Sequence, residues 1–518
     1  MRSWFKFNLG SWRLMSLVAI GIWLVVGVYG VFYNISYIDE SKYLIKGWLM
    51  ATGQIGYYST PEFFYQHMPG GFLWYGLGQK LLGPNLLVAR WQSFAIGLFI
   101  LRISYLLAKK IGNKKTGQLT LMILSLLPVV IFYFSSAVTQ SLAVLFLLLA
   151  FLKLFDKKYL WGSFWLTMAL VVRENFLFTL VIYLVWLFFH LNKRRGLWVK
   201  NLIISLGTLA IFIWPGYPGT LNILKNFPGV SLLLPVSQLE QNVLNIYWQS
   251  NLREFQHFVR ALMEFGVIYY ICFLAIAWIG WLMMKNWKQV IRYINSGVRQ
   301  QMWLFFLFIT GINFLAHAWG AFKLSPRQIV SYFAYTAPMV VVIIASLITP
   351  FLDKKVMTRL SVLYLFLVLL IPVNIRFASI YTPMSKKPAL RLLNESINPL
   401  KEIVKDKDKI VWLTDPMSLY LAGKVSYYYP LLNHTNFYKP TEDTETTKTL
   451  GFWNDEMMQQ WLEEADLVVI DSNRIKLLRE GNQLELIQLI EKELESNFIR
   501  KLVEEYISPG NLSFYERI

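Results

Sequence analysis

Two neighbouring carboxylates, Asp39 and Glu40, are the first residues whose type and position suggest chemistry. They follow a long apolar segment and begin the stretch "DESKYLIKGWLMATGQ". A carboxylate at the edge of a bilayer is costly unless it faces a cavity or a partner. The alternative is structural, with Asp39 as a helix N-cap and Glu40 as a first-turn acid that suits the helix dipole. The two roles do not exclude each other.

Cationic side chains stand at two other unusual places. Arg173 and Glu174 interrupt one long apolar run, and Lys323 and Arg327 lie in the turn "KLSPRQ". Guanidinium groups match the oxygens of phosphate, so Arg173 and Arg327 are candidate anion ligands. Structural alternatives stay open, since Arg173 and Glu174 can simply close a helical hairpin. Lys323 and Arg327 can likewise extend to lipid head groups.

The elements that position these residues are membrane-spanning helices. The chain has 518 residues, of which 56% are hydrophobic and only 16% are charged, whereas soluble domains carry about a quarter charged residues. The apolar residues fall in blocks long enough to cross a bilayer as helices. The fold class is therefore mainly α, a polytopic transmembrane helical bundle. Cys272 is the only cysteine, which excludes an internal disulfide.

About eleven spans are predicted from hydropathy, and we expect the first to remain as a helix because it lacks a small-residue cleavage pattern. They cover residues 14–34, 86–108, 118–134, 138–155, 159–172, 176–191, 197–214, 262–284, 302–320, 329–350 and 357–375. The count is least certain around 159–191, where we read two short spans.

Charge predicts the orientation of the bundle. Residues 1–375 carry a net charge of +23 and residues 376–518 one of −4, which together give the +19 of the chain. The N-terminus and five alternate loops hold 20 Lys and Arg against two acids. The positive-inside rule therefore places the N-terminus in the cytoplasm and the C-terminal domain outside. Loop orientation explains the basic excess better than nucleic-acid binding does.

The predicted domains are residues 1–375, the transmembrane module, and residues 376–518, a soluble extracytoplasmic α/β domain. Short β-rich runs at 409–413, 466–471 and 511–518 predict strands, and the apolar spacing in 454–465 and 482–498 predicts helices. The polar segment 434–451 is predicted to be a mobile loop.

The first outer loop, 35–85, is too long for a simple connection. Its first part has the pattern of an amphipathic helix lying in the membrane interface, ended by Gly53 and Gly56. An aromatic-rich segment, 57–75, follows and contains a Pro-Gly-Gly turn. This segment can line a groove for lipid or consist of ordinary interface aromatics.

The order of these motifs resembles that of a known enzyme family. One span, then Asp-Glu, then "YLIKGWLMATGQIGYY" and "HMPGGFLWY" is similar to the polytopic GT-C glycosyltransferases, especially bacterial relatives of protein O-mannosyltransferase and of the lipid A aminoarabinose transferase. The family's late Arg-Tyr motif corresponds to "SPRQIVSYFAYTAP", where Arg327 is kept and Gln328 replaces the tyrosine. His67 to Gly70 replace the family's Pro-Pro pair. The resemblance covers most of 14–350 in layout.

The resemblance implies an integral-membrane glycosyltransferase, a hexosyl- or pentosyltransferase, in the plasma or inner membrane. It transfers a sugar from a polyprenyl-phosphate donor, with inversion, to an acceptor protein, lipid or glycan at the outer face. Asp39 takes or orients the acceptor proton, and Glu40 supports it. Cationic groups stabilise the leaving phosphate. The implied donor ligands are Arg327, Lys323 and Arg173, with Glu174, His67 and Tyr57 as further candidates.

Other readings remain open at this point. Some GT-C enzymes use a divalent metal, and His67 can bind one with Asp39 or Glu40, although a single histidine is a small ligand set. A transporter or flippase of lipid-linked sugars is the alternative function, but it predicts internal repeats that the sequence lacks. The sequence does not identify the sugar, the acceptor, the oligomeric state or the role of the C-terminal domain.

Overall fold

The computed structural model describes residues 12–34, 38–57, 59–61, 67–216, 298–324, 328–351, 389–432, 438–440, 442–449, 451–480, 483–501 and 512–518. The chain divides into two compact units. The first unit comprises Met1–Ile35, Arg90–Leu209 and Ile246–Lys386, and the second comprises Ser36–Ala89, Ala210–Asn245 and Lys387–Ile518. The predicted domain boundary at residue 375 lies outside the described residues.

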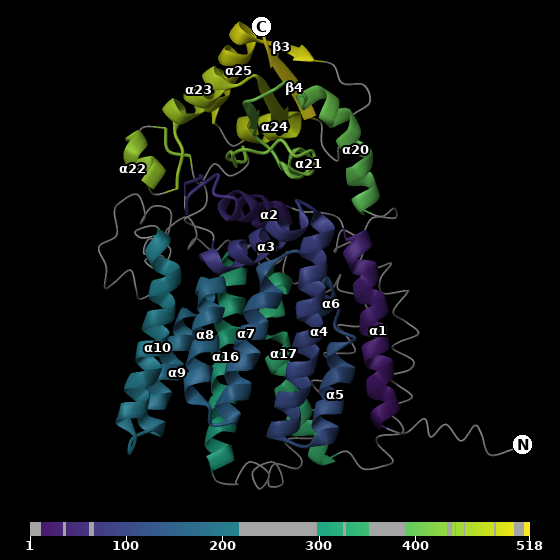
Figure 1. Cartoon of the computed structure of the whole chain (residues 1–518), viewed down its shortest axis with the longest axis vertical. Coiled ribbons are helices and arrows are strands. Elements are labelled where there is room, and N and C mark those ends of the chain that lie inside the picture. Colours follow the sequence, from purple (N-terminus) through teal and green to yellow (C-terminus); the bar gives the residue numbers. More distant parts are fainter. Residues whose placement is uncertain are drawn as a thin grey trace, which may run out of the picture. The chain divides into compact units, whose positions relative to one another are not determined.

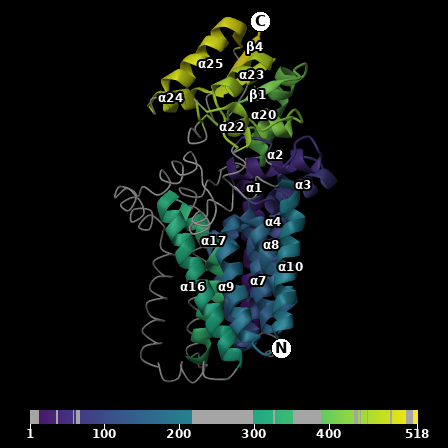
Figure 2. The same ribbon diagram turned by 90° about the vertical axis from the view of Figure 1, so that its left-hand side faces the viewer.

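The first unit is a bundle of apolar helices (Figure 1). Its longer described helices are α1 (Trp12–Tyr33), α4 (Leu86–Ile111, which begins in the second unit), α5 (Lys114–Leu124), α6 (Pro128–Phe134), α7 (Thr139–Phe155), α8 (Tyr159–Val172), α9 (Leu177–His190), α10 (Arg195–Ile213, whose end belongs to the second unit), α16 (Val298–Leu324) and α17 (Gln328–Ile348). Helix α7 packs along α8 and helix α16 along α17, as Figure 2 shows for the second pair.

Nine of the predicted spans fall on described residues, and each is helical there. The span expected at 118–134 is two helices, α5 and α6, because Pro128 begins a new helix. Proline fits a first helical position, where its missing N–H is not needed, and would break a helix interior. The spans expected at 262–284 and 357–375 lie outside the described residues, so the total of eleven stays a prediction.

Polar side chains inside the bundle pair across helices. The Thr179 hydroxyl of α9 donates to the Asn313 side chain of α16 at 2.7 Å. The Ser163 hydroxyl of α8 donates to the Asn201 side chain of α10, also at 2.7 Å. Hydrogen bonds of this kind hold helices together where the surroundings offer no water.

Two described helices, Arg13–Tyr33 and Arg195–Gly216, are each long and apolar enough to cross a membrane alone. Five shorter helices, of 10–17 residues, are also apolar. Large apolar side chains stay exposed on the bundle, including Phe189 at 70% and Ile203 at 62%. Exposed apolar residues of this size are typical of a surface that meets lipid or another protein.

The second unit contains a four-stranded sheet with flanking helices. The strands are β1 (Ile410–Trp412), β2 (Leu467–Asp471), β3 (Phe498–Lys501) and β4 (Leu512–Arg517), in the order β1-β2-β4-β3. Strands β1 and β2 are parallel, whereas β4 is antiparallel to both of its neighbours. The predicted strands at 409–413, 466–471 and 511–518 are therefore confirmed, and β3 is an additional one.

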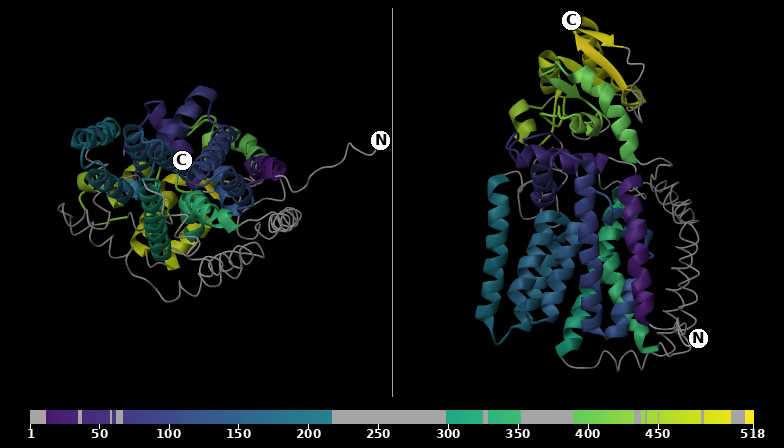
Figure 3. Two further views of the ribbon diagram at one scale, coloured as in Figure 1. Left: turned by 90° about the horizontal axis from the view of Figure 1, so that it is seen from below. Right: turned by 45° about the vertical axis from the view of Figure 1, so that its right-hand side comes forward.

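The helices of this unit are α2 (Ile38–Ala51), α3 (Pro69–Leu82), α20 (Ala389–Val404), α21 (Met417–Leu421), α22 (Thr444–Thr449), α23 (Asp455–Glu464), α24 (Ser472–Glu480) and α25 (Leu484–Asn497). Figure 3 shows them from two further directions. Helices α23 and α25 confirm two predicted helices. Part of the segment expected to be a mobile loop forms helix α22 instead.

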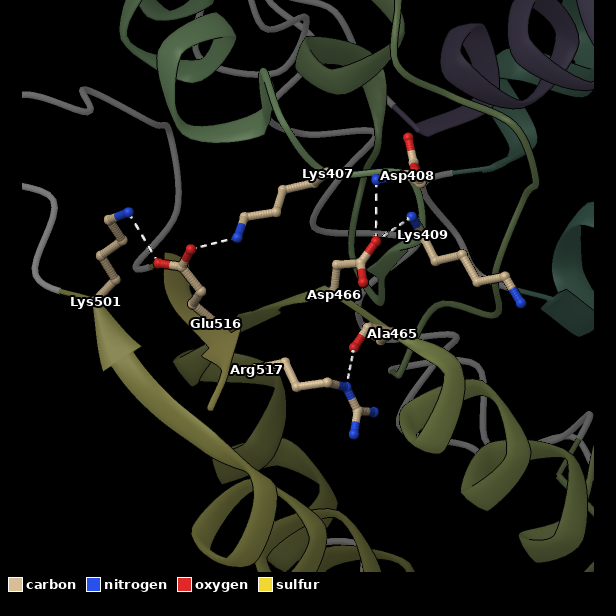
Figure 4. Close-up of polar contacts among 8 residues, drawn as sticks. All are labelled: Lys407, Asp408, Lys409, Ala465, Asp466, Lys501, Glu516 and Arg517. Carbon is tan, nitrogen blue, oxygen red and sulfur yellow. Dashed lines mark hydrogen bonds and ion pairs between the residues drawn. The ribbon is translucent and has the colours of Figure 1, made fainter.

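Polar contacts fix the beginnings of the two parallel strands (Figure 4). The carboxylate of Asp466, just before β2, accepts hydrogen bonds from the backbone N–H of Asp408 at 3.0 Å and of Lys409 at 2.8 Å, just before β1. The Arg517 side chain of β4 donates to the Ala465 carbonyl at 2.7 Å. These bonds satisfy backbone groups that the short strands leave without ladder partners.

Candidate active site

The first turn of α2 holds the candidate carboxylates in two different environments. Helix α2 begins at Ile38, so Asp39 lies inside the first turn and not at the capping position. The Asp39 side chain is 50% exposed, and its carboxylate lies 3.8 Å from the Lys42 Nζ atom. Glu40 is completely buried. Of the two, Asp39 is therefore open to a second molecule, while the side chain of Glu40 is enclosed by the protein.

Helix α2 ends as its glycine predicts. Gly53 has φ +75°, a left-handed conformation that favours glycine. The Gly53 N–H donates to the Met50 carbonyl at 3.1 Å, and the Gln54 N–H donates to the Leu49 carbonyl at 2.9 Å. This pair of bonds is the Schellman motif, which satisfies the last carbonyls of a helix. The length of α2, and so the place of Asp39 at its other end, is fixed locally.

Helices α2 and α3 cross with their backbones in contact. A Cβ atom added to Gly76 would lie 2.0 Å from the Gly47 carbonyl oxygen, and one added to Gly47 would lie 2.4 Å from the Phe72 carbonyl oxygen. Only glycine permits this approach at both positions. Pro69, Gly70 and Gly71, expected to form a turn, instead make the first turn of α3.

The predicted polar side of α2 does not face water. Every residue from 40 to 47 is buried. Lys46 is fully buried, and its Nζ atom donates to the Pro61 carbonyl at 3.0 Å and lies 4.6 Å from the centre of the Tyr428 ring. An ammonium group loses its water when it is buried, and the carbonyl and the aromatic face replace part of that hydration.

Asp415, which the sequence reasoning missed, meets the same turn of α2. The Ser41 hydroxyl donates to the Asp415 carboxylate, which also accepts from the Met417 N–H at 3.1 Å. Burial raises the pKa of the Asp415 carboxyl, and the nearby Glu40 carboxylate raises it further, against the lowering effect of the two hydrogen bonds and of Arg474. Ser41, two residues after Asp39, is thus held in place by a residue from the C-terminal part of the chain.

A sequence signal for Asp415 existed. It follows strand β1 by three residues, and Asp471 is the last residue of the parallel strand β2. In α/β sheets the carboxyl ends of parallel strands are the usual place for functional polar groups. The strand pairing predicts that the two acids are neighbours at one edge, but it does not predict that α2 lies there.

Two tyrosines of the C-terminal part also contact the first outer loop. The Tyr420 hydroxyl donates to the Gln79 side-chain oxygen at 2.9 Å, and the Tyr427 hydroxyl donates to the Ser59 carbonyl at 3.2 Å. Burial raises the pKa of both phenols, so they stay protonated donors at neutral pH. Together with Ser41 and Asp415, these bonds join helices α2 and α3 to the C-terminal domain in one compact unit.

His67 and Tyr57, two further candidates, lie in the loop around α2. The His67 ring is half-buried and stacks on Tyr43 of α2, with ring centres 5.4 Å apart. Tyr57 is half-buried, and burial raises the pKa of its phenol. Among the residues that the structure describes, no group of three His, Cys, Asp or Glu side chains is arranged to hold a metal. A metal ligand role for His67 therefore gains no support here.

Arg173 and Glu174 belong to the first unit. They separate α8 from α9, as predicted, with a short 3-10 turn at Glu174–Phe176. Arg173 is only 6% exposed, and its guanidinium lies 5.6 Å from the centre of the Tyr335 ring on α17. Tyr335 is part of the "SPRQIVSYFAYTAP" segment, so the structure joins two of the stretches that the sequence singled out.

Two further donor-site candidates are Lys323 and Arg327. Arg327 lies outside the described residues, and Lys323 is in the last turn of α16, where only the backbone is described. Asp39 and Arg173 belong to different units.

Comparison with solved structures identifies the fold. Over 98% of this chain and 98% of the other, the structure is similar to ArnT from Cupriavidus metallidurans bound to undecaprenyl phosphate, with a TM-score of 0.56 at 10% sequence identity. ArnT is a lipid A aminoarabinose transferase of the GT-C class. The chain has the GT-C fold. This confirms the resemblance drawn from the motifs, at the level of the fold.

Weaker similarities exist to the apo state of the same ArnT (TM-score 0.48, 13% identity, 98% of this chain and 97% of that one). The archaeal oligosaccharyltransferase AglB from Archaeoglobus fulgidus gives a TM-score of 0.45 at 11% identity, over 96% of this chain and 74% of that one. These scores are too low to carry an argument. No protein-family model and no curated protein matches the sequence.

Proposed function

We propose that this protein is an integral-membrane glycosyltransferase that moves a sugar from a polyprenyl-phosphate donor to an acceptor outside the cytoplasm. The observation that carries the proposal is the first turn of α2, where a half-exposed Asp39 stands beside a completely buried Glu40. The GT-C fold supports it, since the ArnT structure of that fold was solved with undecaprenyl phosphate bound.

The proposed reaction is a direct displacement at the anomeric carbon. The acceptor oxygen forms a bond to that carbon while the bond from the carbon to the phosphate oxygen breaks, so the configuration inverts. The carboxylate of Asp39 takes the acceptor proton, which passes on to solvent. The bonding electrons leave with polyprenyl phosphate. No covalent intermediate on the protein is needed.

Glu40 and its surroundings keep Asp39 in place. Because Glu40 is buried at the same turn as Ser41, which donates to Asp415, the helix start cannot move without breaking contacts inside the unit. The leaving phosphate requires cationic groups that stabilise its growing charge. Arg327, the arginine of the late outer-loop motif, is our first candidate for that role, with Lys323 and Arg173, a guanidinium at a break between two helices, as further ones.

We propose a plasma- or inner-membrane location with a cytoplasmic N-terminus and an extracytoplasmic C-terminal domain. The 20 basic residues of the N-terminus and the alternate loops support this orientation. The acceptor, whether protein, lipid or glycan, then reaches Asp39 from the outer side. The sugar is a hexose or a pentose, and the sequence and fold do not choose between them.

One experiment separates the proposal from the alternative of a flippase. The purified protein is placed in vesicles with undecaprenyl-phosphate sugar labelled in the sugar. A glycosyltransferase frees the label from the lipid, onto an acceptor or onto water. A flippase moves the intact labelled lipid to the opposite leaflet, where an impermeant reagent detects it. Movement without any loss of sugar from the lipid would overturn the proposal.

A further inference from the structure

A cavity lies in the first unit, between helices α1, α4 and α5. Its volume is about 420 Å³. All three helices line it, with Arg13 and Leu17 from α1, Arg102 and Tyr105 from α4, and Lys114 and Gln118 from α5. Figures 1 and 3 show these three helices as neighbours in the bundle. Pockets of about 300–1,000 Å³ are large enough for a small organic ligand.

The cavity is strongly cationic at one end. Arg13 is in the first turn of α1 and Lys114 begins α5. On α4, the Arg102 guanidinium lies 5.9 Å from the centre of the ring of Tyr105, which follows it by three residues. All three cations are exposed, and no lining residue is acidic. The charge of the site is therefore suited to an anion.

One neighbouring cation at this end of the bundle behaves differently. Lys110 of α4 forms an ion pair with Asp156. Among the described residues, Arg13, Arg102 and Lys114 form no ion pair with an acid, although each is accessible. These three lining residues therefore leave three positive charges for a ligand.

The rest of the lining is largely apolar. Five of the lining residues are leucine or isoleucine, and Leu17 stays 59% exposed and so accessible to a ligand. The Tyr105 ring forms a wall because it packs against α5, where a Cβ atom on Gly117 would come within 2.7 Å of it. A free phosphate or nucleotide gains nothing from such walls, whereas acyl chains bury apolar surface there.

We propose that this cavity binds the phosphate head group of an anionic phospholipid from the bilayer, with its acyl chains against the apolar walls. Basic pockets between transmembrane helices are suited to anionic head groups. The site is at the bundle end that the loop charges place in the cytoplasm, so its lipid belongs to the cytoplasmic leaflet. It depends on a membrane location and not on the proposed sugar transfer.

The test uses the whole protein, delipidated in a neutral detergent, and follows its thermal unfolding. Phosphatidylglycerol, phosphatidylcholine and inorganic phosphate are titrated separately. A ligand that binds only the native state stabilises it by an amount that grows with the ratio of ligand concentration to Kd, and so raises the Tm. We expect phosphatidylglycerol to raise the Tm at concentrations where the other two do not. Equal effects of the two lipids, or protection by inorganic phosphate alone, would overturn the proposal.

A matched pair of variants locates the site. Arg102→Ala with Lys114→Ala removes two lining cations from α4 and α5, while Lys109→Ala with Lys115→Ala removes two exposed cations that do not line the cavity from the same helices. Each cation near an anionic lipid contributes a factor of about five, so the first variant should bind phosphatidylglycerol roughly 30-fold more weakly. The second should bind it as the wild type does.

The comparison has a clear negative result. If both double variants lose the same affinity, the cations act as a diffuse surface charge and the proposed site is wrong. If the lining variant does not fold, the lipid selectivity of the wild type still decides, together with native mass spectrometry. We expect phosphatidylglycerol to stay bound in the spectrum under conditions that remove phosphatidylcholine.

Discussion

The two ionisable pairs in the apolar sequence, Asp39–Glu40 and Arg173–Glu174, are held by different means. Asp39 and Glu40 begin a helix that continues with buried charges and is fastened by Asp415, far away in sequence. Arg173 and Glu174 instead separate two helices, and Arg173 lies against an aromatic ring. The first pair therefore depends on a remote domain, and the second on a local break of the chain.

This difference suggests a division of labour. A carboxylate that takes up a proton must lie at a defined distance from the acceptor. A helix start held by a buried side chain and by a hydrogen bond to a distant residue provides this. A cation that stabilises a phosphate needs positive charge and several N–H donors in one plane, which a buried arginine at a helix end provides.

The largest effect is expected for Asp39→Asn. The amide cannot take up the acceptor proton, so the rate of sugar transfer should fall by about 100- to 10,000-fold. Because the Asp39 side chain is half-exposed, the Tm should stay close to that of the wild type. Asp406→Asn, another exposed acid of the same unit, serves as the control. If Asp39→Asn transferred sugar as fast as this control, Asp39 would not be the group that takes the acceptor proton.

A smaller loss is expected for Arg173→Gln. If its guanidinium contacts the donor phosphate, losing a charge-assisted bond should reduce kcat/KM for the donor by roughly 10- to 100-fold. Arg173→Lys keeps the positive charge but loses the paired N–H donors of the guanidinium, so its kcat/KM should lie between those of the wild type and Arg173→Gln. Glu174→Gln, in the same turn, should change this constant least. An unchanged kcat/KM for the donor in Arg173→Gln would mean that Arg173 does not bind the donor phosphate and only packs against the Tyr335 ring.

The crossing of α2 and α3 is expected to be sensitive to a single methyl group. Gly76→Ala places a Cβ atom against the Gly47 carbonyl, which should lower the free energy of unfolding by about 1–3 kcal/mol. The Tm of the purified protein measures this. Gly56→Ala meets no atom within 4 Å and should change the Tm little. Equal stability of the two variants would mean that the helices do not approach so closely.

The smallest effect is a pH dependence at Asp415. Its pKa is raised in the folded protein, so its ionisation opposes folding. As the pH falls through the raised pKa of the folded protein toward the pKa of Asp415 in the unfolded chain, the wild type should gain stability relative to Asp415→Asn. As the pH rises again, this gain should be lost. Asparagine keeps the acceptor for Ser41 and carries no charge. Thermal unfolding of both proteins from pH 4 to 8 measures the difference, and parallel curves would contradict the raised pKa.

Much of the helical architecture could be predicted because it is local. The break at Arg173–Glu174, the helix end at Gly53 and the strands before Asp415 and at 467–471 follow from short patterns of apolar, charged and glycine residues. The position of Glu40 in a first turn was predictable for the same reason. Asp39 was expected as the N-cap and instead lies inside that turn.

The surroundings of the site were not predictable, because they depend on contacts between distant segments. The sequence near Lys46 does not indicate that Tyr428 covers this lysine. From the sequence alone, the side of α2 that carries Lys46 is therefore predicted to face water. Ser41 and Asp415 are separated by 374 residues. Gly47 and Gly76 look like ordinary small residues until the two helices are placed against each other.

The most direct test is a structure of the whole protein with a non-transferable undecaprenyl-phosphonate sugar and an acceptor alcohol. Our account predicts the Asp39 carboxylate about 3 Å from the acceptor oxygen, on the face of the anomeric carbon opposite the phosphonate. A sugar bound with its phosphonate beside Asp39, or with its anomeric carbon beyond reach of that carboxylate, would contradict it.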